Sequence, residues 1–206
     1  MNAELPERTF INFLKSNLKI FTYGISVLIV LVIVFSWFIY ESKQKKIKIS
    51  EDFIKAKIFL ENKNRNEAKK ILADIVMKKN TIYASLSLFL IIDKNLIEDK
   101  KIISKYFDHV ISNNSYNKED INLLRLKKAI YISDISKEAE MLDLLNPIIN
   151  SKSVWKIQSL KFLGDFYYSI NQFKKAKQYY SALLKDDSLD IPKEDINRKI
   201  NSIKNE

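Results

Sequence analysis

The feature that most constrains this chain is an uncharged apolar run near its N-terminus, "IFTYGISVLIVLVIVFSWFIY", over residues 20–40. At 1.5 Å per residue, a helix of this length extends about 30 Å, which matches the hydrocarbon thickness of a bilayer. The apolar region of a cleaved signal peptide is shorter, at about 7–15 residues, and ends in small residues. This run instead ends in Trp37, Phe38 and Tyr40, aromatic residues that are typical of a membrane interface. The run therefore predicts an uncleaved single transmembrane anchor.

The rest of the chain is poor in the residues that form tight turns. Only two glycines and three prolines occur among 206 residues, which disfavours an all-β sandwich. Apolar residues instead recur at helical spacing after the anchor, so we expect an all-α fold. The predicted organisation is a short N-terminal lead at 1–19, the anchor at 20–40, a basic juxtamembrane linker at 41–50 and a helical repeat domain at 51–206.

Cysteine and histidine, which are common in catalytic and metal sites, are also scarce. The chain has no cysteine and a single histidine, His109. The lack of cysteine excludes disulfides, thiolate metal sites and cysteine nucleophiles. One histidine is little material for a metal site or a catalytic triad, and we expect His109 to be a surface or hydrogen-bonded residue. We predict no catalytic residue, no metal site and no cofactor.

The formal net charge of +10 raises the question of an anionic partner. The lysines are spread along the chain among Asp and Glu, with one brief cluster, "KQKKIK", at residues 43–48. No basic patch is interleaved with aromatic residues, so we expect no nucleic-acid partner. The cluster itself is placed to contact lipid headgroups.

After the anchor the sequence falls into amphipathic pairs of helices joined by polar segments. Asn64 and Glu67 resemble a capping box at the start of the second helix of the first pair. Pro192 suits the first turn of a closing helix. Helix–turn–helix units of about 34 residues are typical of a tetratricopeptide-type solenoid. The register of the repeats between residues 81 and 150 stays open.

The fourth pair, "LKFLGDFYYSINQFKKAKQYYSALLKD", carries the repeat pattern best. Its signature residues are Leu160, Leu163, Gly164, Tyr167, Ala176 and Tyr180, while Ser188 replaces the final proline of the motif. The first pair repeats the twelve-residue spacing of small residues with Ala56 and Ala68.

Gly164 calls for a packing reason, because a glycine within a helix costs about 1 kcal/mol against alanine. Gly164 and Ala176 stand where the two antiparallel helices are expected to approach most closely. A large side chain at either position would force the helices apart. We expect Gly164→Leu to be strongly destabilising and Gly164→Ala to be much milder.

This layout resembles the YfgM-like family, the ancillary subunit of the bacterial SecYEG translocon, whose final repeat carries a Gly-Asp that matches Gly164-Asp165. The resemblance implies a chaperone-like interaction scaffold in the inner membrane. Its partners would be translocon subunits, periplasmic chaperones or exported clients. It also implies a periplasmic domain, whereas the lysines after the anchor favour the cytoplasm. We follow the resemblance, because long domains translocate largely regardless of charge.

A solenoid of hairpins presents a concave surface formed by the first helix of each pair. The candidate partner-binding residues on this surface are Phe53, Lys57, Leu60, Lys161, Asp165 and Tyr168. Asp165 either faces a ligand or pairs locally. Two other functions stay open: an interaction subunit of cytochrome-c maturation or envelope assembly, and a cytoplasmic basic module that binds anionic lipid or nucleic acid.

Overall fold

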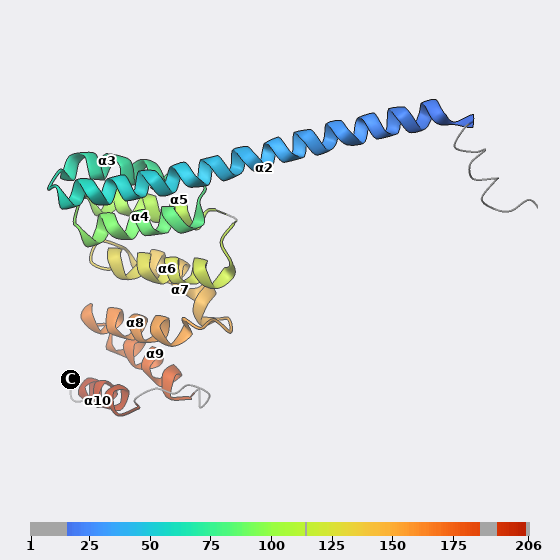
Figure 1. The fold of residues 1–206 in the computed structure, drawn as a ribbon. Coiled ribbons are helices and arrows are strands. Elements are labelled where there is room, and N and C mark those ends of the chain that lie inside the picture. Colours follow the sequence, from blue (N-terminus) through green and yellow to red (C-terminus); the bar gives the residue numbers. More distant parts are fainter. Residues whose placement is uncertain (1–15, 114, 186–192, 205–206) are drawn as a thin grey trace, which may run out of the picture. The chain divides into compact units, whose positions relative to one another are not determined.

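The computed structural model describes residues 16–113, 115–185 and 193–204, and every regular element in these ranges is an α-helix. The all-α prediction is therefore confirmed for this part of the chain. Figure 1 shows the helices in chain order. Their bounds are α2 Leu18–Glu61, α3 Arg65–Val76, α4 Thr81–Asp93, α5 Lys100–Ile111, α6 Lys118–Ile132, α7 Glu138–Ile149, α8 Lys156–Ser169, α9 Phe173–Lys185 and α10 Lys193–Lys204. Pro192 and Ser188 lie outside the described residues.

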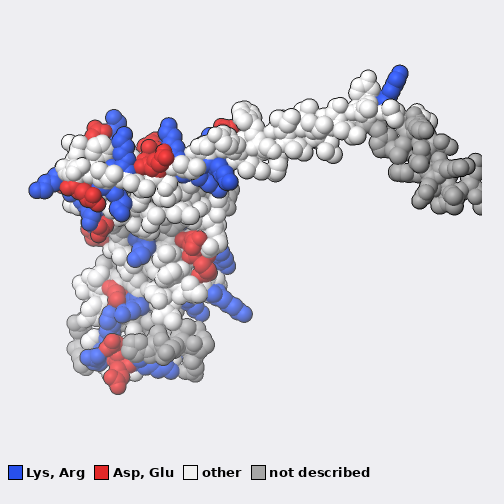
Figure 2. Space-filling model, in the orientation of Figure 1, with Lys and Arg blue, Asp and Glu red and all other residues white. Residues whose placement is uncertain are grey.

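The chain divides into two units between Glu51 and Asp52. In the first unit, α2 continues without a break through the predicted linker at 41–50, which is therefore helical. Its apolar run is exposed from Tyr23 to Tyr40, and Figure 2 shows a stretch of this helix without charged residues. Among the described residues, α2 is the one helix that is long and apolar enough to cross a membrane. Because its apolar window is not buried by protein, it is not a core helix, which fits the predicted anchor.

The second unit is built from successive hairpins, α2–α3, α4–α5, α6–α7 and α8–α9, with α10 packed on α9. The predicted cap at the start of α3 is present: the Asn64 side-chain oxygen accepts a hydrogen bond from the Glu67 backbone N–H. The turns after α2, α4 and α8 contain Lys63, Asn95 and Asn171, whose φ values are 59°, 47° and 59°. Glycine usually supplies this left-handed conformation at helix ends. Asparagine and lysine supply it here, which explains how helical hairpins form with so little glycine.

One burial pattern recurs in each of these four hairpins. A buried residue on the first helix is followed twelve residues later by a buried residue on the second, which gives the pairs Ala56/Ala68, Ile91/Ile103, Ala129/Met141 and Gly164/Ala176. The second helix adds buried residues four and seven positions further on, namely Leu72/Ile75, Phe107/Val110, Leu145/Ile148 and Tyr180/Leu183. The structure thereby fixes the register between residues 81 and 150 that the sequence leaves open.

The packing at Gly164 corrects one expectation. The ring of Tyr180, which is only 1% exposed, lies directly against the glycine. A Cβ added to Gly164 would lie 2.6 Å from Cδ1 and 3.0 Å from Cζ of this ring, and closer still to Cε1. The prediction that glycine permits close packing in this hairpin agrees with this contact. The expectation that Gly164→Ala is mild does not, because even one methyl group overlaps the ring.

Candidate functional site

Asp165, a predicted partner-binding residue, makes contacts with other residues of this chain. Its Oδ1 accepts a hydrogen bond of 2.6 Å from the Tyr180 hydroxyl and pairs with the Lys199 ammonium group. The Lys199 Nζ also lies 5.4 Å from the centre of the Tyr180 ring. These contacts join α8, α9 and α10. Of the two roles open to Asp165 in the sequence, the structure favours local pairing.

A similar polar cluster joins α7, α8 and α9. The Glu138 carboxylate accepts from the Tyr167 hydroxyl at 2.9 Å and from Lys175 Nζ at 2.5 Å. The Tyr167 ring stacks on Tyr179 with 5.3 Å between ring centres. The hydrogen bonds from Lys175 and Tyr167 hold the pKa of Glu138 below its ordinary value. Burial and the neighbouring Glu138 raise the pKa of the Tyr167 hydroxyl, and burial and Asp165 do the same for Tyr180.

The two buried tyrosines are expected to make the fold sensitive to alkaline pH. A tyrosine with a raised pKa in the folded state contributes stability that is fully present below the unfolded pKa of about 10 and is lost as the pH rises above it. We expect the free energy of unfolding to be nearly constant between about pH 7 and 9 and to fall above about pH 10. Urea unfolding at stepped pH measures this. Because lysine deprotonation acts in the same direction, Tyr180→Phe is the control: its fall should be smaller, and an equally steep fall would contradict the role of Tyr180.

The other predicted partner-binding residues lie apart, on the first and fourth hairpins. Lys57 and Lys161 are exposed on α2 and α8. Phe53 and Leu60 are half-buried and pack against the core of the first two hairpins, where the Phe53 ring lies 5.4 Å from Tyr83. Tyr168 is half-buried beside Phe173, at 5.5 Å between ring centres. The structure does not gather these residues around one pocket.

An apolar pocket of about 380 Å³ lies instead between the second and third hairpins. It is lined by Phe89, Ile92, Phe107, Lys127, Ile130 and Tyr131, which come from α4, α5 and α6. Ile130 is 47% exposed, and the lining residues other than Lys127 are apolar or aromatic. This volume is at the lower end of the range for ligand pockets, and the apolar and aromatic walls favour an apolar group.

The repeat register relates this pocket to the predicted surface. Ile92 lies 35 residues after Lys57, Ile130 lies 38 after Ile92, and Asp165 lies 35 after Ile130. Each of the four directly follows the first-helix member of its hairpin's twelve-residue pair, so they are repeat equivalents. Ile92 and Ile130, which line the pocket, are therefore the middle-hairpin equivalents of the predicted surface residues Lys57 and Asp165. These two residues are not predictable from the sequence, because the register of the middle hairpins is not apparent in it.

The walls of the pocket are held by aromatic contacts. The Phe107 ring lies 6.3 Å from Phe89 and 6.3 Å from Tyr131 between ring centres. Lys100 Nζ lies 5.5 Å from the centre of the Tyr131 ring and pairs with Asp134 at 2.7 Å. These neighbours fix the ring positions, so the pocket is formed before any ligand binds.

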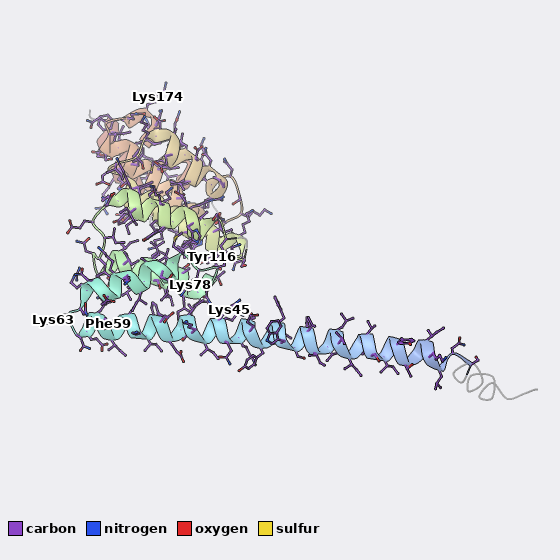
Figure 3. The ribbon with its side chains drawn as sticks, turned by 90° about the horizontal axis from the view of Figure 1, so that it is seen from above. Lys45, Phe59, Lys63, Lys78, Tyr116 and Lys174 are labelled. Carbon is purple, nitrogen blue, oxygen red and sulfur yellow. The ribbon has the colours of Figure 1, made fainter. Side chains whose placement is uncertain are left out.

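Charged and hydroxyl groups outside the pocket brace the same helices. Lys128, whose side chain is 6% exposed, pairs with Asp108 on α5 at 2.7 Å and Glu140 on α7 at 3.4 Å. The Tyr116 hydroxyl, labelled in Figure 3, donates to the Thr81 carbonyl at 2.5 Å and ties the segment before α6 to the start of α4.

The described residues contain no group of acidic and histidine side chains that could hold a metal ion. His109 Nε2 lies 3.1 Å from the Met77 carbonyl oxygen, which agrees with the prediction of a surface or hydrogen-bonded histidine.

Comparison with known proteins adds one relative that spans the chain. No protein-family model matches the sequence, and no solved structure matches it. The chain is similar to a protein of Buchnera aphidicola subsp. Schizaphis graminum (strain Sg) that is named "Ancillary SecYEG translocon subunit". The two sequences are 29% identical over 201 residues, which cover 92% of this chain and 96% of the relative. The similarity thus includes both the apolar helix and the hairpins.

Proposed function

We propose that this chain is a membrane-anchored interaction scaffold of the YfgM-like family and an ancillary subunit of the SecYEG translocon. The observation that carries the proposal is the full-length similarity to a relative of that name, 29% identical over 201 residues. The architecture supports it, because an exposed apolar helix of membrane-spanning length precedes an array of helical hairpins. The twelve-residue spacing of buried residues in successive hairpins supports a tetratricopeptide-type array.

The pocket between α4, α5 and α6 is the proposed contact site for protein partners. It offers apolar and aromatic walls to a side chain of a bound segment, with Lys127 on its lining. Tethering to the membrane raises the local concentration of the hairpin domain near other membrane proteins, so weak contacts suffice. We infer that the partners are translocon subunits, exported clients or periplasmic chaperones, and that the chain crosses the inner membrane once with its hairpins in the periplasm.

A site-directed crosslink tests this proposal. The chain has no cysteine, so Ile130→Cys introduces a single thiol in the pocket that can carry a photoreactive maleimide. Irradiation of the full-length protein in its native membrane, followed by mass spectrometry, is expected to identify crosslinks to translocon subunits. These crosslinks should far exceed those from a matched control position.

Ile170→Cys is that control, because Ile170 is exposed to a similar extent, 42% against 47%, and does not line the pocket. Equal crosslinking from both positions would show that contact is not specific to the pocket. Crosslinks from Ile130→Cys to envelope-assembly proteins, without translocon subunits, would contradict the proposed function and support the alternative.

A further inference from the structure

A cluster of lysines follows the apolar run on the same helix. After Tyr40, α2 carries Lys43, Lys45, Lys46 and Lys48, and all four side chains are exposed. Each residue of an α-helix advances about 100° around the axis, so these lysines stand near 0°, 200°, 300° and 140°. They therefore surround the helix rather than occupy one face. Figure 3 labels Lys45 on this segment. We call these four residues the lysine collar.

The collar is poorly neutralised by its own helix. Glu41 pairs with Lys45 at 2.8 Å, with both side chains well exposed. Among the residues that the structure describes, Lys43, Lys46 and Lys48 have no carboxylate within ion-pair distance. Three exposed cations therefore remain available to an anionic partner.

The distance from the apolar run places Lys43 and Lys45 at the depth of lipid headgroups and Lys46 and Lys48 just beyond it, with side chains that point back along the helix toward its N-terminus. Lys43 follows Tyr40 by three residues and Lys48 by eight, which corresponds to about 4.5 and 12 Å along a helix. The headgroup region adds about 5–8 Å to each side of the hydrocarbon core. Lysine side chains extend along the helix to keep their ammonium groups at this boundary. The phosphate groups of the surrounding lipids lie within their reach.

We propose that the lysine collar binds the headgroups of anionic phospholipids and enriches these lipids around the anchor. Lipids surround a membrane helix on all sides, and the four lysines point in all directions around the helix axis. A protein or nucleic acid would contact one side of the helix. The proposal rests on the membrane anchor of the proposed function but not on the translocon. It assigns a ligand class, the phosphodiester headgroup of an anionic lipid, to residues outside the hairpin pocket.

Trp37, which lies within two turns of the collar, provides a probe of the neighbouring lipids. The full-length chain is reconstituted in phosphatidylcholine vesicles that contain a minor fraction of phosphatidylglycerol. In one set the phosphatidylglycerol is brominated near the carbonyl end of its acyl chains; in the other, an equal fraction of phosphatidylcholine is brominated. Bromine quenches the fluorescence of a nearby tryptophan. The second tryptophan, Trp155, also emits, so its fluorescence is measured in the Trp37→Phe variant and subtracted.

We expect quenching of Trp37 by brominated phosphatidylglycerol to exceed that by brominated phosphatidylcholine by at least about two-fold. The excess should fall with added salt, since exposed charges are screened. It should be lost when Lys43, Lys45, Lys46 and Lys48 are all changed to Gln. A matched variant with Lys57, Lys69, Lys70 and Lys79 changed to Gln, all exposed in the hairpin unit, should keep it.

The contrary outcomes separate this proposal from the proposed function. Equal quenching by both lipids would show that the anchor inserts but selects no lipid, which overturns the collar and leaves the scaffold intact. An excess that persists in the collar variant would also overturn it. No quenching by either lipid would show that α2 does not insert, and both proposals would fail.

Discussion

Replacing Gly164 by leucine is expected to lower the free energy of unfolding of the hairpin domain by roughly 3 kcal/mol or more. The site has no room for a side chain, since the Tyr180 ring lies closer to an added Cβ than van der Waals contact allows. Tyr180 cannot move aside freely, because its ring is 1% exposed and its hydroxyl is bonded to Asp165. The gain in helix propensity on removing a glycine, about 1 kcal/mol, is too small to offset this overlap.

Gly164→Ala is expected to cost about 1–2 kcal/mol net for the same reason. The repeat register suggests the compensating change. At the positions equivalent to Gly164 and Tyr180, the first and third hairpins carry alanine and leucine. These pairs are Ala56/Leu72 and Ala129/Leu145. Tyr180→Leu alone removes the ring and leaves a gap above the glycine. In that background Gly164→Ala fills space and favours the helix, so its effect should change sign and become stabilising.

A double-mutant cycle on a fragment of residues 48–206 measures this coupling, by urea unfolding followed with far-ultraviolet circular dichroism. The structure predicts that Gly164→Ala destabilises the parent and stabilises the Tyr180→Leu variant. Equal effects in the two backgrounds would contradict the ring contact. Unchanged stability of Gly164→Leu would exclude a packing role for this glycine altogether.

The sequence was sufficient to predict the features of this fold that depend on local chemistry. Helical periodicity and scarce glycine predict an all-α chain, and the Asn64 cap marks the start of α3. A close approach at Gly164 is also predictable, because a helical glycine needs a packing reason. The partner in that contact is not predictable from small-residue spacing alone: Ala176 matches the pattern, but it is the Tyr180 ring that covers the glycine.

The candidate pocket could not be predicted, because it depends on the register of the second and third hairpins. There the equivalents of the small residues are Ile91, Ile103 and Met141, so the signal of paired small residues is absent. The spacing also changes, since Ala129 follows Ile91 by 38 residues whereas Ile91 follows Ala56 by 35. The local pairing of Asp165 is hidden for a related reason: its cation, Lys199, belongs to α10, whose packing the repeat motif does not describe.

A second prediction concerns the side of the membrane on which the hairpins lie. Charge alone favours the cytoplasm, because three basic residues, Arg8, Lys15 and Lys19, precede the apolar run whereas four lysines follow it closely. We nevertheless expect the hairpins in the periplasm, since the proposed family places them there and a long domain translocates largely regardless of flanking charge. The lysine collar would then contact the outer leaflet of the inner membrane.

Single cysteines decide the orientation without interference, because the natural chain contains none. Lys161→Cys lies on an exposed position of α8, and Asn2→Cys lies before the anchor. In spheroplasts, a membrane-impermeant maleimide should label Lys161→Cys almost completely and Asn2→Cys only after the membrane is lysed. The reverse pattern would place the hairpins in the cytoplasm. The flanking lysines would then have set the topology, and the translocon contact would have to occur on the cytoplasmic side, where periplasmic chaperones are not available as partners.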